Sequence, residues 1–152
     1  EELAAIDLAI ETMTDLSSSI RNSFGLYLNK EASQLVSGIT GGIYNSMSID
    51  ENLGVFLNTK TKLVPIENVS SGTMDQVYLA LRLAAAKLLQ EDGGQMPLIF
   101  DDSFTQYDDD RLKTALYWLS KAYSGQMIFF TCHKREAQML RAGQIPFHLV
   151  EI

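Results

Sequence analysis

The chain has 152 residues, 46% of them hydrophobic, and a formal net charge of −7. This length suits one ordinary domain with a buried core. The negative charge argues against binding a nucleic-acid backbone through this chain, because such binding needs clustered Lys and Arg. The single cysteine, Cys132, excludes an internal disulfide and paired-cysteine metal sites. No apolar run is long enough for a membrane span and no leader sequence is present, so we expect a cytoplasmic protein without membrane contact.

Residues 1–36 are predicted to form one long helix. Its apolar residues follow alternating steps of three and four, interrupted at Ser17: Leu3, Ile6, Ile10, Met13, Ile20, Phe24 and Tyr27. This is a coiled-coil period, but with fewer than four clean heptads it also fits an amphipathic helix packed on its own domain. The chain opens on Glu1 within this pattern, without an initiator Met, so we expect it to be part of a longer polypeptide.

Glycines at positions 38, 41 and 42 are predicted to end this helix. We interpret residues 38–42 as a turn rather than a phosphate loop, because no Gly-Lys-Ser/Thr follows them. Within residues 43–66, short apolar segments at 55–57 and 63–66 flank a turn-like segment at 58–61. This pattern predicts a small antiparallel β layer.

A second helix is predicted to begin within residues 69–76. Its apolar stripe has helical spacing: Met74, Val77, Tyr78, Leu81, Ala85 and Leu88. Ser70 or Ser71 can cap the N-terminus, and Thr73 with Gln76 fits a capping box. A helix start with free N–H groups, a serine hydroxyl and Gly72 can also bind an anion, so the capping and anion-binding interpretations both remain open.

Within residues 96–104, a short apolar strand introduced by Gly93-Gly94 and Pro97 ends in two adjacent carboxylates, Asp101 and Asp102. A buried parallel strand delivers acids to a ligand crevice in this way. Carboxylates in such a place need a metal, hydrogen bonds or a shared proton, and Mg²⁺ held partly through water is the leading metal. The alternative is that one of the two acids caps the segment that follows.

The rest of the chain continues this α/β alternation. After a loop at 103–108, the acids Asp108 to Asp110 are predicted to cap a helix whose apolar stripe is Leu112, Ala115, Leu116, Leu119 and Ala122. A second buried strand at 127–130 leads to His133, which is expected at the same sheet edge as Asp101. A lone His at a strand end is often structural, and its matched position favours a functional role. A short helix at 134–142, stopped by Gly143, and a final strand at 147–152 complete the predicted elements.

These residues form an ordered set of motifs. Val69-Ser70-Ser71-Gly72-Thr73 resembles the ABC signature motif, with Gln76 continuing the form common in SMC-like heads. Residues 98–102 resemble Walker B, Thr105-Gln106-Tyr107-Asp108 resembles the D-loop, and His133 resembles the H-loop histidine. Together they resemble the C-terminal lobe of an ABC-type ATPase head of the RecF/RecN/SMC kind, in particular bacterial SMC-like AAA-type ATPases with a coiled-coil insertion. The resemblance spans about residues 37–135 and favours the coiled-coil interpretation of residues 1–28.

The resemblance implies a fold and a mechanism. Residues 1–36 would be the C-terminal end of a coiled-coil arm, and residues 37–152 the C-terminal lobe of a P-loop/ABC-type head. Two such heads sandwich Mg²⁺ and ATP, with Asp101 holding the metal and Asp102 acting as general base. The nucleotide-binding residues would be Ser70, Ser71, Gly72, Thr73 and Gln76. Among them, Ser70 and the N–H of Gly72 would meet the γ-phosphate bound on the other protomer, while His133 would contact that phosphate from the same protomer.

The implied partners are an N-terminal P-loop lobe of the same polypeptide, a second head in a homodimer, and DNA contacted through other regions, in DNA repair or chromosome maintenance. Three departures from the family pattern matter: Asp102 stands where Glu is common, Ser71 stands where transporters have a second glycine, and no Walker A lysine is present. We therefore expect that this chain alone neither binds ATP tightly nor hydrolyses it. Two alternatives are a non-hydrolytic ATP-dependent dimerisation clamp and, less favoured because of the long helix, an ABC transporter subunit.

Overall fold

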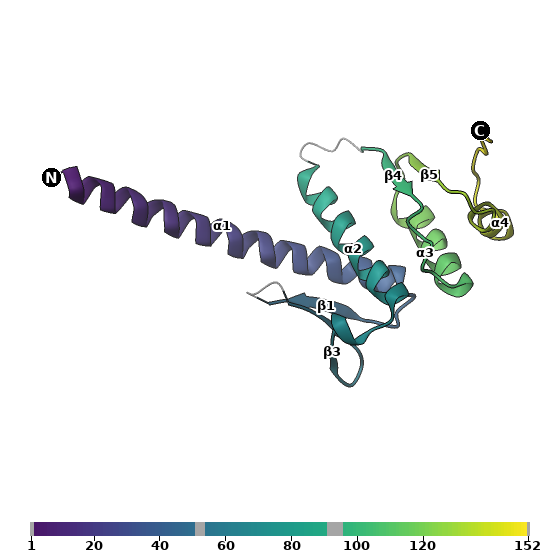
Figure 1. Cartoon of the computed structure of the whole chain (residues 1–152), viewed down its shortest axis with the longest axis horizontal. Coiled ribbons are helices and arrows are strands. Elements are labelled where there is room, and N and C mark those ends of the chain that lie inside the picture. Colours follow the sequence, from purple (N-terminus) through teal and green to yellow (C-terminus); the bar gives the residue numbers. More distant parts are fainter. Residues whose placement is uncertain (1, 51–53, 91–95, 152) are drawn as a thin grey trace.

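The computed structural model describes residues 2–50, 54–90 and 96–151 (Figure 1). Its elements are α1 (Glu2–Ile39), β1 (Ser46–Ile49), β2 (Val55–Asn58), β3 (Leu63–Pro65), a 3₁₀ turn η1 (Ile66–Asn68), α2 (Ser71–Leu89), β4 (Leu98–Asp101), α3 (Asp109–Ala122), β5 (Met127–Phe130) and α4 (Arg135–Ala142). The predicted α/β class, the small antiparallel layer and the long N-terminal helix are confirmed. Gly93 and Gly94, predicted to introduce β4, lie outside the described residues.

Helix α1 projects from the rest of the molecule over its N-terminal part (Figure 1). The apolar series predicted there is exposed, from Leu3 at 77% to Tyr27 at 40%. Farther along, Ala32, Val36 and Ile39 are fully buried in the core. No helix in the described ranges combines the length and apolarity needed to cross a membrane.

The C-terminal end of α1 lies at Ile39 rather than at the predicted residue 36. Gly38 is still helical, and a Cβ at this position would lie 1.9 Å from Nε1 of Trp118, so the indole packs directly on the glycine. The turn itself is made by Gly41 and Gly42, whose φ values of 63° and 80° lie in the region that glycine adopts most easily. Of the three predicted glycines, the second and third therefore form the turn that follows the helix.

The antiparallel sheet has the order β1-β2-β3, with Met47 opposite Leu57 and Leu57 opposite Val64. Two polar side chains of α1 cover the outer edge of β1. Asn29 exchanges two hydrogen bonds with the backbone of Ile49, at 2.7 and 3.2 Å, and Ser33 exchanges two with Met47 at the same distances. These side chains satisfy the edge in place of another strand.

Helix α2 buries Val77, Ala80 and Ala84, and its N-terminus is capped as predicted by Ser70, whose Oγ accepts from the N–H of Thr73 at 3.3 Å. The predicted capping box is wrong. The side chain of Gln76 is buried, and its Nε2 donates to the carbonyl of Ile39 at 3.0 Å. The last carbonyls of a helix lack partners within the helix, so Gln76 satisfies one at the end of α1.

Strands β4 and β5 pair in parallel, with Leu98 opposite Met127 and Asp101 opposite Phe130, and α3 forms the crossover. The parallel pairing is confirmed, but the predicted burial of both strands is only partly right. Ile99 is 63% exposed and Phe130 is 51% exposed. Within the described residues each strand has one hydrogen-bonded neighbour, and the uncovered faces account for this exposure.

The predicted final strand is wrong over residues 147–151, which form no strand. This tail follows α4 at the end of the molecule (Figure 1), where Leu149 is 46% and Val150 is 70% exposed. A strand needs a neighbouring backbone for its hydrogen bonds, and alternating sequence alone does not supply one. Ile152 lies outside the described residues.

Candidate functional site

The N-terminus of α2 presents an exposed pair of serines. Ser70 has the extended N-cap conformation, with φ −68° and ψ 156°, and Ser71 begins the helix. The first N–H groups of a helix have no carbonyl partner within it and carry its positive dipole end. This surface therefore has the donors that an anion requires.

Gly72 lies on the inner side of this helix start, against the loop at residues 103–108. A Cβ at this position would lie 2.8 Å from the carbonyl oxygen of Gln106. That separation is shorter than side-chain carbons tolerate, so the glycine allows the loop backbone to touch the helix. The residues predicted as signature and D-loop are thus in direct contact.

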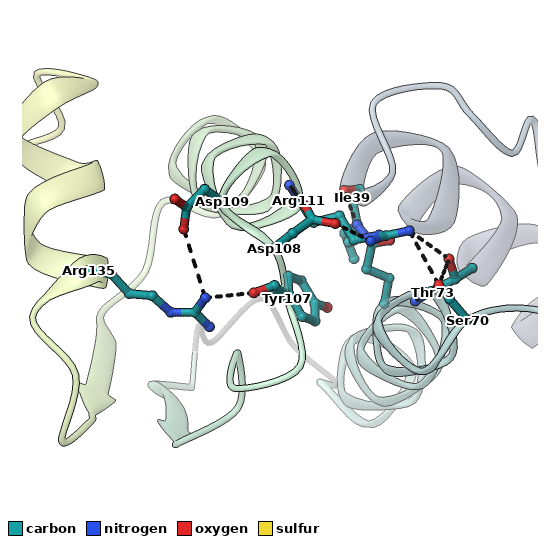
Figure 2. Close-up of polar contacts among 9 residues, drawn as sticks. Ile39, Ser70, Thr73, Tyr107, Asp108, Asp109, Arg111 and Arg135 are labelled. Atoms are coloured by element: carbon teal, nitrogen blue, oxygen red, sulfur yellow. Dashed lines mark hydrogen bonds and ion pairs between the residues drawn. The ribbon is translucent and has the colours of Figure 1, made fainter.

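An aromatic cluster and an arginine fix the loop at residues 103–108. Phe104 and Tyr107 are 2% exposed and pack edge-on at 5.3 Å, and Phe104 also packs on Phe129 of β5 at 5.7 Å. From α4, Arg135 donates Nη1–H to the carbonyl of Tyr107 at 2.6 Å (Figure 2). Its Nη2–H donates to the carbonyl of Phe104. We did not identify Arg135 from the sequence, since no local pattern shows which carbonyls it meets.

Tyr107 is buried, and its hydroxyl has no hydrogen-bond partner among the residues that the structure describes. Burial, followed by the nearby charge of Asp75, raises the pKa of this phenol well above its usual value of 10.0, against a smaller opposing effect of Arg111. Tyr107 therefore supports the loop from inside the core.

Arg111 of α3 joins this loop to α2 (Figure 2). Its Nη2 lies 3.3 Å from Oγ of Ser70 and 3.4 Å from Oγ1 of Thr73, and its Nη1 pairs with the carboxylate of Asp108. The N–H of Arg111 donates to Oδ1 of Asp108 at 2.8 Å, which confirms Asp108 as the predicted cap of α3. This backbone hydrogen bond, helped by the arginine charge, lowers the pKa of Asp108.

The two strand-end acids lie beside the segment that follows β5. Asp101 is exposed, and Asp102 has a φ of 43°, a left-handed conformation that Asp tolerates better than most residues. The N–H of Asp102 donates to the carbonyl of Phe130 at 2.9 Å, and its Oδ1 accepts from the N–H of Cys132 at 3.3 Å. The acids and residues 131–133 therefore share one sheet edge, as predicted. His133 is exposed next to this contact, and its N–H donates to Oγ1 of Thr131 at 3.0 Å.

The two acids suit a partly hydrated Mg²⁺ better than a metal ion held entirely by protein ligands. Asp101 and Asp102 are exposed and offer only oxygen atoms, which are the ligands that Mg²⁺ prefers. The described residues contain no group of three or more His, Cys, Asp or Glu side chains that could hold a metal. Mg²⁺ commonly keeps several waters and uses one or two carboxylates together with substrate phosphates, so this pair fits an ion shared with a nucleotide.

A groove of about 410 Å³ extends from the acids between α2 and β4. It is lined on the α2 side by Asp75, Tyr78 and Arg82, and on the β4 side by Ile99, Asp101, Asp102 and Thr105, among others. Tyr78 is 46% exposed and Ile99 is 63% exposed, so part of the groove's lining is apolar. The site continues into an open surface that a further segment or molecule can cover.

The residues predicted from the sequence thus fall into two groups. Ser70, Ser71, Gly72 and Thr73 lie with Gln106, Tyr107 and Asp108, while Asp101 and Asp102 lie with the segment that carries His133. Gln76 belongs to neither group, because its side chain is buried and bonded to the end of α1. Arg111 and Arg135 complete the first group, and the sequence interpretation missed both.

No protein-family model matches the chain. Over 128 residues it is 32% identical to the uncharacterized protein YhaN of Bacillus subtilis (strain 168). The match covers 81% of this chain and 13% of YhaN, so the chain spans a small part of that relative's length.

Three solved structures share the fold. One comes from work on ATP-driven dimerization and DNA-stimulated activation of SMC ATPases, with a TM-score of 0.65 and 18% identity over 80% of this chain and 76% of that one. The second is the Smc head of Pyrococcus furiosus with an extended coiled coil, bound to the C-terminal domain of ScpA, with a TM-score of 0.60 and 19% identity over 86% and 35% of the two chains. The third is the Smc head of Pyrococcus yayanosii with a coiled coil and joint, with a TM-score of 0.59 and 17% identity over 86% and 27%.

These likenesses define the fold class of the chain, which is that of the C-terminal part of an SMC head.

Proposed function

We propose that this chain is the C-terminal lobe of an SMC-like ATPase head. With an N-terminal P-loop lobe of the same polypeptide, it binds ATP and hydrolyses it between two heads. The observation that carries this proposal is the contact between the start of α2 and the loop at 103–108, which continues from the strand-end acids. Because the chain lacks a P-loop lysine, the second lobe has to supply it.

Each part of the site has a role in this mechanism. Asp101 holds Mg²⁺, which when bound neutralises phosphate charge. Asp102 orients or deprotonates the attacking water. Ser70 and the N–H groups that follow it bind the γ-phosphate held by the opposite head. His133 donates to that phosphate from the same head as the acids, so the site is complete only when two heads meet.

The exposed apolar face of α1 supports a coiled-coil arm. Residues 1–36 form the end of a coiled coil, and residues 37–152 form the lobe. Seven apolar side chains at coiled-coil spacing stay exposed: Leu3, Ile6, Ile10, Met13, Ile20, Phe24 and Tyr27. A second helix of the same polypeptide, packed along this face, removes them from water. Transporter subunits lack a long coiled-coil helix at this place, so the exposed face of α1 weighs against an ABC transporter subunit.

One contact favours a second candidate function. The carboxylate of Asp102 accepts a hydrogen bond from Cys132, and Asp is one methylene shorter than the more common Glu. A carboxylate held in this way can be structural, in which case ATP closes the heads as a clamp and turnover is absent.

The experiment joins this chain to its P-loop lobe, with a short linker replacing the coiled coil, and follows Mg-ATP-dependent dimerisation and phosphate release. If the complete head hydrolyses ATP with Asp102 as general base, Asp102→Asn should lower turnover by about 100-fold or more. Asp110→Asn is the matched control, because it makes the same charge change at an exposed position of α3. Dimerisation without turnover supports the clamp, and no ATP-dependent dimer refutes both functions.

We place this activity in DNA repair or chromosome maintenance, with DNA contacted through other regions because this chain carries a net charge of −7. The solved structure with the highest TM-score given above comes from work on DNA-stimulated SMC ATPases, which supports the choice. DNA should therefore raise the turnover of the complete protein but should not bind this chain alone. Tight DNA binding by the chain itself would contradict this assignment.

A further inference from the structure

Arg111 lies between the start of α2 and the loop at 103–108, and it contacts both. Its guanidinium has five N–H donors in a rigid plane and no acceptor. One end of this plane pairs with Asp108, and the other reaches the hydroxyls of Ser70 and Thr73, which lie on a different helix. The stem of the side chain also passes over Gly72, where a Cβ would lie 3.6 Å from Cδ and Nη1 of Arg111.

The contacts of Ser70 occupy both acceptor positions of its hydroxyl oxygen. Its oxygen accepts from the N–H of Thr73 at 3.3 Å and from Nη2 of Arg111 at 3.3 Å. A hydroxyl has two acceptor lone pairs and one proton, so both lone pairs are in use. The proton is therefore free to be donated, either to Oγ1 of Thr73 at 3.0 Å or to a ligand in front of the helix.

We infer that Arg111 is a positioning residue that makes Ser70 a hydrogen-bond donor toward phosphate and ties it to the D-loop residue Asp108. This inference rests on the function proposed above and names the residue that prepares the phosphate contact. Without Arg111, the serine oxygen can accept from water and turn its proton elsewhere.

The same contact couples the helix start to the loop. Asp108 holds one end of the guanidinium and caps α3, so a displacement of the loop moves Arg111 and with it the Ser70 hydroxyl. The loop and the helix start therefore respond to phosphate together.

The test uses the chain joined to its P-loop lobe and measures three quantities: the ATP concentration for half-maximal dimerisation, the affinity of the separate monomer for ATP, and thermal stability. Arg111→Gln and Arg111→Lys should each raise the half-maximal ATP concentration about tenfold or more, because a hydrogen bond to a charged group is lost. Lysine keeps the charge but cannot span both partners, so a wild-type result for Arg111→Lys would overturn the inference. ATP affinity of the monomer should stay unchanged, and Lys113→Gln on the same helix serves as the charge-matched control.

A double-mutant cycle with Ser70→Ala separates positioning from general stabilisation. If Arg111 acts through Ser70, the double variant Ser70→Ala/Arg111→Gln should be no worse than Ser70→Ala alone. Effects that multiply, or a loss of dimerisation that follows only a loss of thermal stability, would overturn the inference while leaving the proposed function intact. A wild-type protein that does not dimerise with ATP would refute the proposed function and this inference together.

Discussion

Gly38 provides a sharp test of how α1 packs on the lobe. A Cβ at this position would lie 1.9 Å from Nε1 and 2.1 Å from Cε2 of Trp118, so in Gly38→Ala the indole has to retreat by about 1.5 Å to restore a normal contact. A tryptophan side chain buries about 150–250 Å², and losing half of that area costs about 2–3 kcal/mol at about 25 cal/mol/Å². Alanine returns up to about 1 kcal/mol of helix propensity, so the net loss should be about 1–2 kcal/mol.

The assay is urea unfolding of the chain followed by fluorescence, because Trp118 is the sole tryptophan. Gly38→Ala should lower the midpoint and shift the native emission to longer wavelength as the indole enters water. Gly25→Ala is the matched control on the same helix, where a Cβ meets nothing within 4 Å, and it should leave the emission unchanged while stabilising the helix by about 0.5–1 kcal/mol. Unchanged emission and midpoint in Gly38→Ala would refute this account of the contact.

Three further predictions concern groups that the fold buries or pairs. Gln76→Leu leaves the carbonyl of Ile39 without its donor, so urea unfolding should show a loss of about 1–3 kcal/mol, and a wild-type midpoint would argue against the contact. Folded Tyr107 keeps its proton above pH 10.0, where unfolded tyrosines lose theirs, so stability should fall as the pH rises past that value. Tyr107→Phe should make this fall shallower in thermal melts, and an identical slope would count against the buried phenol. Folded Asp108 stays ionised below the usual pKa of 3.8, so its stabilising effect is present above that pH and is lost as the pH falls further. Asp108→Asn should reduce the acid-side loss of melting temperature, and an unchanged acid profile would contradict the pairing with Arg111.

Features that depend on neighbours in the sequence were predicted correctly. Ser70 and Asp108 cap helices whose N–H groups lie three residues farther along the chain, so the residue types reveal the contact. The parallel placement of β4 and β5 followed from two apolar runs separated by a helix. These rules involve short distances along the chain and few competing partners.

Features that depend on distant partners were not predicted. Gln76 meets Ile39 from 37 residues away, and Arg111 meets Ser70 from 41 residues away. Gly38 has the residue type of a helix breaker, but it is helical, and Trp118 from α3 packs on it. Residues 147–152 have a strand pattern, yet 147–151 have no strand to pair with in the described chain. One sequence does not specify which distant surfaces meet, and these contacts depend on that information.

In the proposed function, each catalytic site forms between two heads, with the acids from one and Ser70 from the other. A complementation experiment tests this claim most directly. Ser70→Arg and Asp102→Asn, each placed in the chain joined to its P-loop lobe, should both abolish phosphate release when assayed alone. When the two variants are mixed in equal amounts, half of the dimers are heterodimers. Each heterodimer has one intact site of two, so turnover should recover to about a quarter of the wild-type value. No recovery on mixing, despite ATP-dependent heterodimer formation, would contradict the claim that the two residues act from opposite heads.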